Sequence, residues 1–476
     1  MRDALKRLTA ESLIYGLGQV SGRAVQLLLV PILTRTLTRD VYGVADLVMA
    51  YAQFATLALV FGMDGALVRF LYQEPDGDAR RRMISTSLQF RVAASVTCAL
   101  ALALLAAPLT PLLTGSEAYR KYVMIGAFTL PFTLVGLFAN DVLRVTFQPW
   151  KFIALNLTQT LVTGGVSLWL VLGRDLGVAG VLYGKLAGDA FAAAFGLVLM
   201  RHSLVPAFDR DVLSRMLRYG APLVPASIAY GVVGSADRWF LQRSQGLAEV
   251  GVYAVAIKFF SVAMMGVSAF SLAFFPFAHA RSADPGAPRL YARALDLYVA
   301  VASFAALGIS LFASEALAFL VPAAYHGAAR PAALLSFAAV AYGAYYVACL
   351  GLQFALRTAW LGWIAAGAAL TAVAAHALLT PRWGSMGAAT ATWIGNVALA
   401  IATFVAAQAV HRLPYRGPRA LGLFVLATGA AVMVPRLAPA GLAGAGIKLA
   451  TLAGFAGVGA WLAVRRPGAG AGAGGN

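Results

Sequence analysis

Charged residues are scarce in this chain of 476 residues: Asp, Glu, Lys and Arg together make up 12% of it, and apolar residues make up 61%. Soluble domains are typically about one quarter charged. A water-soluble fold is therefore excluded, because the chain could not cover its surface with polar groups. Apolar runs of about 20 residues recur from end to end, and each is long enough to cross the hydrocarbon core of a bilayer. A backbone in that core must satisfy its own hydrogen bonds, so the sequence predicts an all-α, polytopic membrane protein.

Cysteine and histidine are also rare, which limits the chemistry that the chain could perform. Cys98 and Cys349 lie inside apolar runs and give neither a disulfide framework nor a metal-site spacing. The histidines are scattered, mostly at the ends of the apolar runs: His202, His279, His326, His376 and His411. No nucleophile–base pair, metal-ligand set or phosphate-binding glycine loop accompanies them, and the loops are short. We expect no enzyme activity, no cofactor and no bound metal.

Acidic residues number 19 against 37 Lys and Arg, which gives a formal net charge of +18. The basic residues form no continuous stripe or aromatic-interleaved patch, so nucleic acid is not an expected partner. With a cytoplasmic N-terminus, the inner segments hold most of the basic residues, among them Arg80, Arg215 and Arg412, and the outer loops hold few, such as Arg120. This asymmetry follows the positive-inside rule and predicts that both termini are cytoplasmic.

Apolar runs between charged or turn-rich breaks predict about fourteen transmembrane spans, an even number that agrees with two cytoplasmic termini. The runs lie near residues 10–33, 42–64, 84–108, 122–143, 151–172, 177–200, 219–241, 250–277, 294–314, 331–354, 359–379, 384–408, 419–435 and 442–463. The N-terminal residues are basic like those of a signal peptide, but no A-x-A-like cleavage site follows the first run, so we expect this run to remain as a helix. Residues 465–476 form a Gly/Ala-rich tail that is predicted to be disordered.

The chain resembles itself at an offset of about 208 residues, which predicts an internal repeat. Gly177, Gly180, Gly188 and Asp189 in the first half align with Gly384, Gly387, Gly395 and Asn396 in the second. Thr36, Tyr42 and Gly43 align in a similar way with Ser244, Val250 and Gly251. An even number of helices per repeat preserves orientation, so two pseudo-symmetric lobes of about six helices should be related by an axis along the membrane normal, with the substrate path between them. We predict an N-terminal lobe over residues 1–205, a C-terminal lobe over 206–410 and a further helix pair over 411–464.

Three stretches carry a resemblance to a known family. Residues 30–70 contain the Tyr42–Gly43 pair, followed by Gly62, Asp64 and Arg69. Residues 221–277 contain Asp237–Arg238 at the end of one run and Gly251 with Tyr253 at the start of the next, and residues 378–398 read LLTPRWGSMGAATATWIGNVA. In this order the stretches resemble the polysaccharide biosynthesis flippases, the lipid-linked oligosaccharide (O-antigen type) exporters of the multidrug/oligosaccharidyl-lipid/polysaccharide (MOP) superfamily. The resemblance extends over about residues 10–410.

The resemblance implies a two-lobed fold of about fourteen helices in the bacterial inner membrane. It also implies that the protein moves isoprenoid-pyrophosphate-linked oligosaccharide by alternating access, for polysaccharide biosynthesis. The implied partners are the lipid-linked oligosaccharide, membrane lipids and other polysaccharide assembly proteins. Two alternatives within the superfamily are a flippase for the peptidoglycan lipid precursor and a multidrug extruder, and the surplus of basic residues argues against the extruder. A membrane-embedded polysaccharide polymerase or acyltransferase would need a polar loop or an acid–base cluster, which the sequence lacks.

Basic side chains inside the spans are the first candidates for a functional site, because an ionised group at mid-membrane costs at least about 2.5–3.5 kcal/mol unless it faces water or a partner. Four of them could hold an anionic pyrophosphate or its sugar: Arg23, Arg91, Arg238 and Lys258. Guanidinium binds phosphate oxygens in a fork geometry, and Lys supplies a compact charge. We predict that the four share one water-filled cavity between the lobes. For Arg91 and Lys258, about two turns into their spans, snorkelling to the near interface is an equal alternative.

Other charged residues in the spans are candidates for structural pairs. Lys185 and Asp189 are four residues apart and can form an ion pair on one helix face, which favours a structural role. Asp64 with Arg69 could brace the second helix at its inner end. Asp237 is adjacent to Arg238, so it could hold that side chain or lie at the interface.

Ion coupling would need a carboxylate within the membrane that binds a proton or Na⁺. Asp189, Asp64 and Asp46 are the carboxylates available for this role. The sequence does not choose among them.

Overall fold

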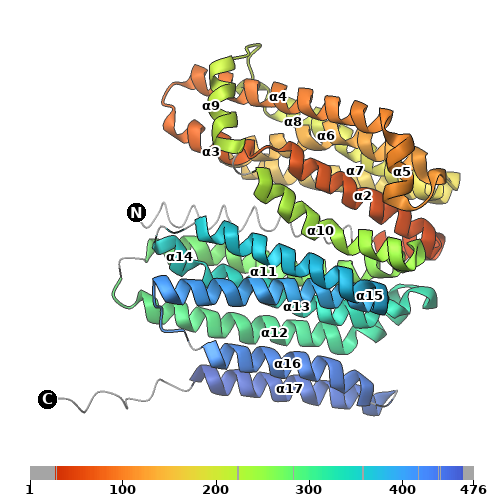
Figure 1. The fold of residues 1–476 in the computed structure, drawn as a ribbon, viewed down its shortest axis with the longest axis vertical. Helices are drawn as coiled ribbons and strands as arrows, with labels where there is room; N and C mark the ends of the chain where they lie inside the picture. Colours follow the sequence, from red (N-terminus) through yellow and green to blue (C-terminus); the bar gives the residue numbers. More distant parts are fainter. Residues whose placement is uncertain are drawn as a thin grey trace.

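Every regular element that the structure describes is a helix. The computed structural model describes residues 27, 29–221, 224–281, 284–355, 357, 359–415, 417–437, 439 and 441–464. Figure 1 shows the helices up to residue 199 at one end of the molecule, those over residues 224–410 next to them, and the last two helices, α16 (Gly417–Leu437) and α17 (Leu442–Val464), at the far end. The prediction of an all-α, polytopic membrane protein is confirmed.

Among the described residues, the first half of the chain contains a helical segment over residues 29–36 and then seven α-helices. They are α2 (Arg39–Leu59), α3 (Met63–Gln73), α4 (Gly77–Leu104), α5 (Ala106–Thr114), α6 (Arg120–Val145), α7 (Pro149–Arg174) and α8 (Gly177–Leu199). Short 3₁₀ turns, η1 (Glu117–Tyr119) and η2 (Arg201–Ser203), precede α6 and follow α8. The predicted second span is broken between α2 and α3, where Phe61 and Gly62 have φ values of 52° and 64°.

The second half begins with a short helix, α9 (Arg210–Gly220), and eight further α-helices follow among the described residues. These are α10 (Val224–Gln245), α11 (Leu247–Ala280), α12 (Ala287–Leu320), α13 (Ala329–Ala348), α14 (Leu350–Phe354), α15 (Ala359–Val410), α16 (Gly417–Leu437) and α17 (Leu442–Val464), with a 3₁₀ segment, η4 (Ala323–Ala328), before α13. In α9, Val212 and Met216 are buried and Arg215 and Arg218 are exposed. This amphipathic helix packs on α3 and α4 and connects the two halves.

Eleven helical stretches among the described residues are long and apolar enough to cross a membrane. This number differs from the predicted count of about fourteen in three places. Most of the first predicted span, 10–33, lies outside the described residues. The 22-residue helix α10, which carries Asp237 and Arg238, is not among the eleven. Helix α15 is counted once, although it consists of two helical segments that meet at Gly384.

Two helical hairpins occupy corresponding places in the two halves. α15 reverses direction at Gly384, whose φ of 56° and ψ of −134° suit glycine and few other residues. Gly395 on the returning segment packs against Ala372 on the outgoing segment. The connection from α7 to α8 is similar, because Gly177 has a φ of 51° and Gly188 packs closely against α7. The aligned glycines therefore have matching roles, as a repeat requires, while the division into lobes at residues 205 and 410 stays a prediction.

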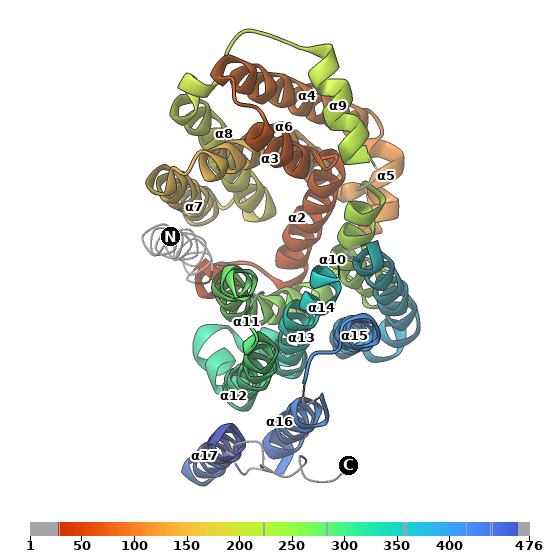
Figure 2. The same cartoon turned by 90° about the vertical axis from the view of Figure 1, so that its left-hand side faces the viewer.

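The two halves meet where α2 crosses α11, as Figure 2 shows. A Cβ atom on Gly43 would overlap the carbonyl oxygen of Leu247, and a Cβ atom on Gly251 would overlap the carbonyl oxygen of Arg39. The crossing is symmetric, because Gly251 aligns with Gly43 and Leu247 aligns with Arg39 at the same offset. A buried apolar cluster with residues from α2, α8, α11 and α13 surrounds the crossing. The fold thus brings equivalent helices of the two halves into backbone contact.

Candidate functional site

Charged side chains from both halves meet where α10 packs on α2. The Nε atom of Arg238 lies 2.9 Å from Oδ2 of Asp46, and an Nη atom of Arg238 lies 3.0 Å from Oδ1 of Asp237. That atom, Nη1, also donates a hydrogen bond to the carbonyl oxygen of Gly234 at 3.2 Å. The side chains of Arg238 and Asp46 are 12% and 10% exposed, so little water screens their attraction. Since Asp46 belongs to the first half and Arg238 to the second, this ion pair joins the halves.

Lys258 on α11 completes this group of charges. It is half-buried and acts electrostatically on Asp46. We call Asp46, Asp237, Arg238 and Lys258 the interface charge cluster. Two of its members are acidic and two are basic, so the cluster is neutral when all four are ionised. The structure therefore places a balanced network at the interface, where the sequence predicts a cationic surface.

An anion could still bind to this cluster by exchange. The hydrogen bonds to Asp46 and Asp237 use Nε and Nη1 of Arg238, so neither carboxylate engages Nη2. Guanidinium can bind phosphate oxygens through two parallel hydrogen bonds. A phosphate that approaches Arg238 and Lys258 would compete with Asp46 for the same cations. Binding an anion here would therefore weaken the contact between the halves.

Arg91 lies apart from the interface charge cluster. Its side chain on α4 is 0% exposed, and Nη1 lies 3.4 Å from Oδ2 of Asp141 on α6. Its guanidinium carbon lies 5.0 Å from the centre of the Phe138 ring, and Asp64 acts on it electrostatically. The Nε and Nη2 atoms have no hydrogen-bond partner among the described residues. Arg91 is thus enclosed in the first half and does not join Arg238 and Lys258.

Lys185 and Asp189 lie on one face of α8 and form an ion pair with the spacing of one helical turn. Asp189 is fully buried, and it also accepts hydrogen bonds from Gln159 of α7 at 2.9 Å and from Thr133 of α6. The side chain of Lys185 is 35% exposed. Donors from three helices therefore surround this carboxylate, an arrangement that suits helix packing.

The remaining predicted residues occupy separate places. Arg23 lies outside the described residues. Asp64 is exposed on α3 and interacts with Arg91. Arg69 lies over the ring of Tyr219, 4.9 Å from its centre, so it packs on α9. The structure does not bring Asp64 and Arg69 together as an ion pair.

Besides the ion pair of Arg91, sequence reasoning missed two contacts. The pairing of Asp46 with Arg238 joins residues in different halves, and no local spacing indicates it. Lys448 of α17 forms an ion pair with Glu315 of α12, which attaches the C-terminal helix pair to the second half. Both contacts connect residues far apart in the chain, so only the three-dimensional packing reveals them.

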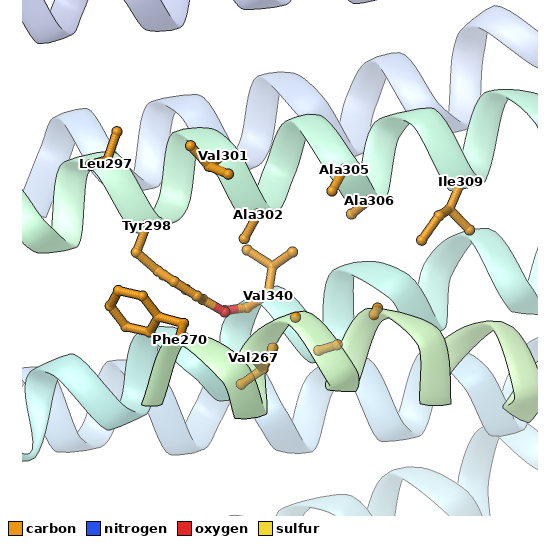
Figure 3. Close-up of a pocket in the computed structure, with 13 residues that line it drawn as sticks. Val267, Phe270, Leu297, Tyr298, Val301, Ala302, Ala305, Ala306, Ile309 and Val340 are labelled. Atoms are coloured by element: carbon orange, nitrogen blue, oxygen red, sulfur yellow. The ribbon is translucent and has the colours of Figure 1, made fainter. Parts of the chain in front are cut away.

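An apolar pocket of about 300 Å³ lies between α11, α12 and α13 (Figure 3). Val267, Phe270 and Val340 line it, together with Tyr298, whose hydroxyl donates to the Val340 carbonyl oxygen at 3.2 Å. No ionisable side chain other than Tyr298 is among its lining residues. The pocket could take a hydrocarbon group but offers nothing to hold a pyrophosphate. Among the described residues, no group of three or more His, Cys, Asp or Glu side chains could hold a metal ion.

Comparison with known proteins gives one family. The family described as "Polysaccharide biosynthesis protein" matches residues 32–330 of the chain. A search of curated proteins finds no match.

Several solved structures share the fold at low sequence identity. A structure titled lipid II flippase MurJ, in an inward closed conformation, has a TM-score of 0.75 and 12% identity, with 95% of this chain and 100% of that chain covered. An inward-facing multidrug resistance MATE family transporter of the MOP superfamily has a TM-score of 0.66 and 16% identity, with 81% and 94% covered. A MOP superfamily transporter from Pyrococcus furiosus has a TM-score of 0.60 and 14% identity, with 85% and 95% covered. These likenesses concern the fold.

Proposed function

The chain belongs to the polysaccharide biosynthesis protein family, and we propose that it moves an isoprenoid-pyrophosphate-linked oligosaccharide across the bacterial inner membrane. It is a multi-pass membrane transporter with the fold of the MOP superfamily. The family description supports a polysaccharide precursor as the substrate. The similarity in fold to a lipid II flippase over nearly the whole chain supports a lipid-linked one.

The observation that carries the proposal is the ion pair between Asp46 and Arg238 across the two halves. The substrate's pyrophosphate displaces Asp46 from Arg238 and Lys258, because its oxygens compete for the same donors. Loss of the pair then releases α10 from α2, and the halves separate at the interface charge cluster. Substrate binding and the change of access are thereby linked through one exchange of partners.

The orientation of the protein follows from the positive-inside rule. Both termini lie in the cytoplasm, so α2 begins on the outer side of the membrane. The crossing of α2 with α11 then closes the outer side, and the substrate enters from the cytoplasm. Other polysaccharide assembly proteins deliver and receive the lipid-linked oligosaccharide.

The test is transfer of a lipid-linked oligosaccharide across proteoliposomes. Arg238→Ala should reduce transfer by about tenfold or more, since a charge-assisted hydrogen bond is worth about 1.5–3 kcal/mol. Arg238→Lys should retain part of the activity, because it keeps the charge without the fork. Arg174→Ala is the matched control, since Arg174 is exposed at the end of α7. Each variant is first checked for normal insertion and a single peak in size-exclusion chromatography.

Wild-type rates of transfer decide the substrate. A peptidoglycan lipid precursor carries the same pyrophosphate, so it is assayed beside the oligosaccharide. Faster transfer of the oligosaccharide supports the proposal, and faster transfer of the peptidoglycan precursor replaces it. Equal transfer by Arg238→Ala and Arg174→Ala would remove Arg238 from the substrate path.

A further inference from the structure

One histidine is buried in the second half of the molecule. His376, on the outgoing segment of α15, is 0% exposed, whereas His202, His279, His326 and His411 are exposed. Its Nδ1 lies 3.3 Å from Oγ1 of Thr380, one helical turn along. Its ring stacks on that of Phe240 from α10, with ring centres 6.2 Å apart and planes inclined by 6°. Packing thus fixes the imidazole in one orientation.

The other ring nitrogen of His376 is unused. Nε2 is buried and has no hydrogen-bond partner among the described residues. Buried polar atoms in proteins are nearly always hydrogen-bonded, so an exception calls for an explanation. A neutral imidazole with Nδ1 protonated would present a free lone pair at Nε2. In that tautomer, Nε2 is the ring nitrogen to which a proton would add.

Burial favours the neutral form of the His376 ring, and Asp237 is the charged group that opposes this effect. Its side chain lies on α10, one turn before Phe240, and is 6% exposed. From α11, Tyr253 is buried and interacts with the same carboxylate. A carboxylate beside an imidazole stabilises the protonated, cationic form of the ring. The site therefore has both a proton acceptor and a counter-ion.

The other elements packed against His376 add little charge. The returning segment of α15, residues 385–410, contains no Asp, Glu, Lys, Arg or His. α13 contributes Arg330 in its first turn and otherwise only tyrosines among its ionisable residues. Arg382 of α15 and Glu249 of α11 lie near the Gly384 turn, where Glu249 accepts a hydrogen bond from the backbone of Ser385 at 3.2 Å. Asp237 is thus the acidic residue that interacts electrostatically with His376.

Asp237 connects the histidine to the interface charge cluster. The same carboxylate lies 3.0 Å from the guanidinium of Arg238, which also binds Asp46 of the other half. The geometry points to His376 as a proton-binding site that acts on Arg238 through Asp237. A proton from solvent adds to Nε2, and the resulting imidazolium attracts Asp237. Asp237 then neutralises less of the positive charge of Arg238. Arg238 therefore binds its other anion more strongly, whether that anion is Asp46 or the substrate's pyrophosphate.

The first half offers a contrast. Its buried carboxylate, Asp189, already has an internal cation in Lys185 and further donors in Gln159 and Thr133. No exchangeable proton is needed to neutralise it. Asp237 instead shares Arg238 with Asp46, so a second cation on His376 changes the balance of the cluster. The role of the proton in transport rests on the proposed function, whereas its binding to His376 does not.

The experiment is nuclear magnetic resonance of protein labelled with ¹⁵N-histidine in nanodiscs, titrated in K⁺ buffers and again in Na⁺ buffers. His376→Gln assigns the buried signal, and the exposed histidines serve as internal references. We expect the His376 nitrogens to change from neutral to cationic as the pH is lowered from about 8 to about 4, because Asp237 offsets the burial that favours the neutral ring. In Asp237→Asn the change should move to more acidic pH by about one unit or more, because the counter-ion is lost. His326→Gln, at an exposed position, should leave the signal unchanged.

Two results would overturn the inference. One is a His376 that stays neutral throughout this range, as a purely structural core histidine would. The other is a titration that Asp237→Asn does not move or that follows Na⁺ instead of pH. Oligosaccharide transfer is measured separately on the same samples. Transfer without titration refutes the proton site and leaves the proposed function, whereas titration without transfer refutes the function and leaves the proton site.

Discussion

The charge of Asp189 is buried and depends on its partners. Lys185 forms the ion pair, and Gln159 and Thr133 add hydrogen bonds. The two members of the pair are not equivalent, because Asp189 is fully enclosed and Lys185 is 35% exposed. Removing one partner of a buried ion pair is costly mainly because the other is left uncompensated. The loss of stability should therefore depend on which of the two side chains, Lys185 or Asp189, is replaced.

Lys185→Met should destabilise the protein more than Asp189→Asn. The first change leaves a buried carboxylate without its cation, which costs up to about 3–5 kcal/mol. The second leaves Lys185 able to reach water with its flexible side chain. The apparent Tm of each variant in detergent measures the difference.

Equal losses in the two variants, or a larger loss in Asp189→Asn, would contradict this account of the pair. Local spacing was enough to predict that Lys185 and Asp189 meet, since residues four apart share a helix face. It was not enough for Arg238, whose partner Asp46 lies on another helix of the other half. The sequence did not identify His376 as a site residue either, because a histidine in an apolar run has the same sequence context whether or not a carboxylate faces it.

At the scale of helices, the crossing of α2 with α11 depends on two glycines. A side chain on either would meet the backbone of the other helix. Small residues allow membrane helices to approach closely, and van der Waals packing then stabilises the contact. The crossing is therefore sensitive to a single methyl group, although each glycine lies within a regular helix.

Gly43→Ala should destabilise the protein, and Gly266→Ala should not. A Cβ atom added at Gly43 would overlap the carbonyl oxygen of Leu247, whereas the Cβ position at Gly266 on α11 has no neighbour within 4 Å. Alanine is favoured over glycine in a helix interior by up to about 1 kcal/mol, so the control should be neutral or stabilising. The apparent Tm and the yield of folded protein report both effects. A Gly43→Ala variant as stable as Gly266→Ala would show that the helices adjust freely.

Helix ends were predicted with uneven success, for reasons of local conformation. The turn between the outgoing and returning segments of α15 was placed correctly, since Pro381 and Gly384 interrupt the apolar run. The break at Phe61 and Gly62 was missed, because the run remains apolar across it. Which helices then cross could not be predicted: Gly43 and Gly251 mark a repeat in the sequence, but nothing local says that they touch.

At the scale of the molecule, repeated glycines and even helix numbers predicted two related halves. The way in which the halves meet depends on contacts between distant residues, such as those of α2 with α10 and α11. Transport by alternating access requires these contacts to open and close. A covalent bond across this interface should therefore stop transport, whereas a similar bond within one half should not.

Cysteines at Ala50 and Ser235 provide the bond across the interface. The Ser235 hydroxyl lies 3.4 Å from the carbonyl oxygen of Ala50, which places α10 and α2 close together. Ser167 and Val181 offer a matched pair within one half, with the Ser167 hydroxyl 3.5 Å from the Val181 carbonyl oxygen. Cys98 and Cys349 are replaced first, so that only the new pairs can be oxidised.

Oxidation should abolish oligosaccharide transfer in the protein with Ala50→Cys and Ser235→Cys, and reduction should restore it, because the disulfide holds α2 against α10. The protein with Ser167→Cys and Val181→Cys should continue to transfer after oxidation, since α7 and α8 belong to the same half. Mass spectrometry of the intact protein measures how much disulfide has formed. Undiminished transfer in the fully oxidised Ala50→Cys, Ser235→Cys protein would mean that this interface stays closed during transport, and the exchange of partners at Arg238 could then not drive the change of access.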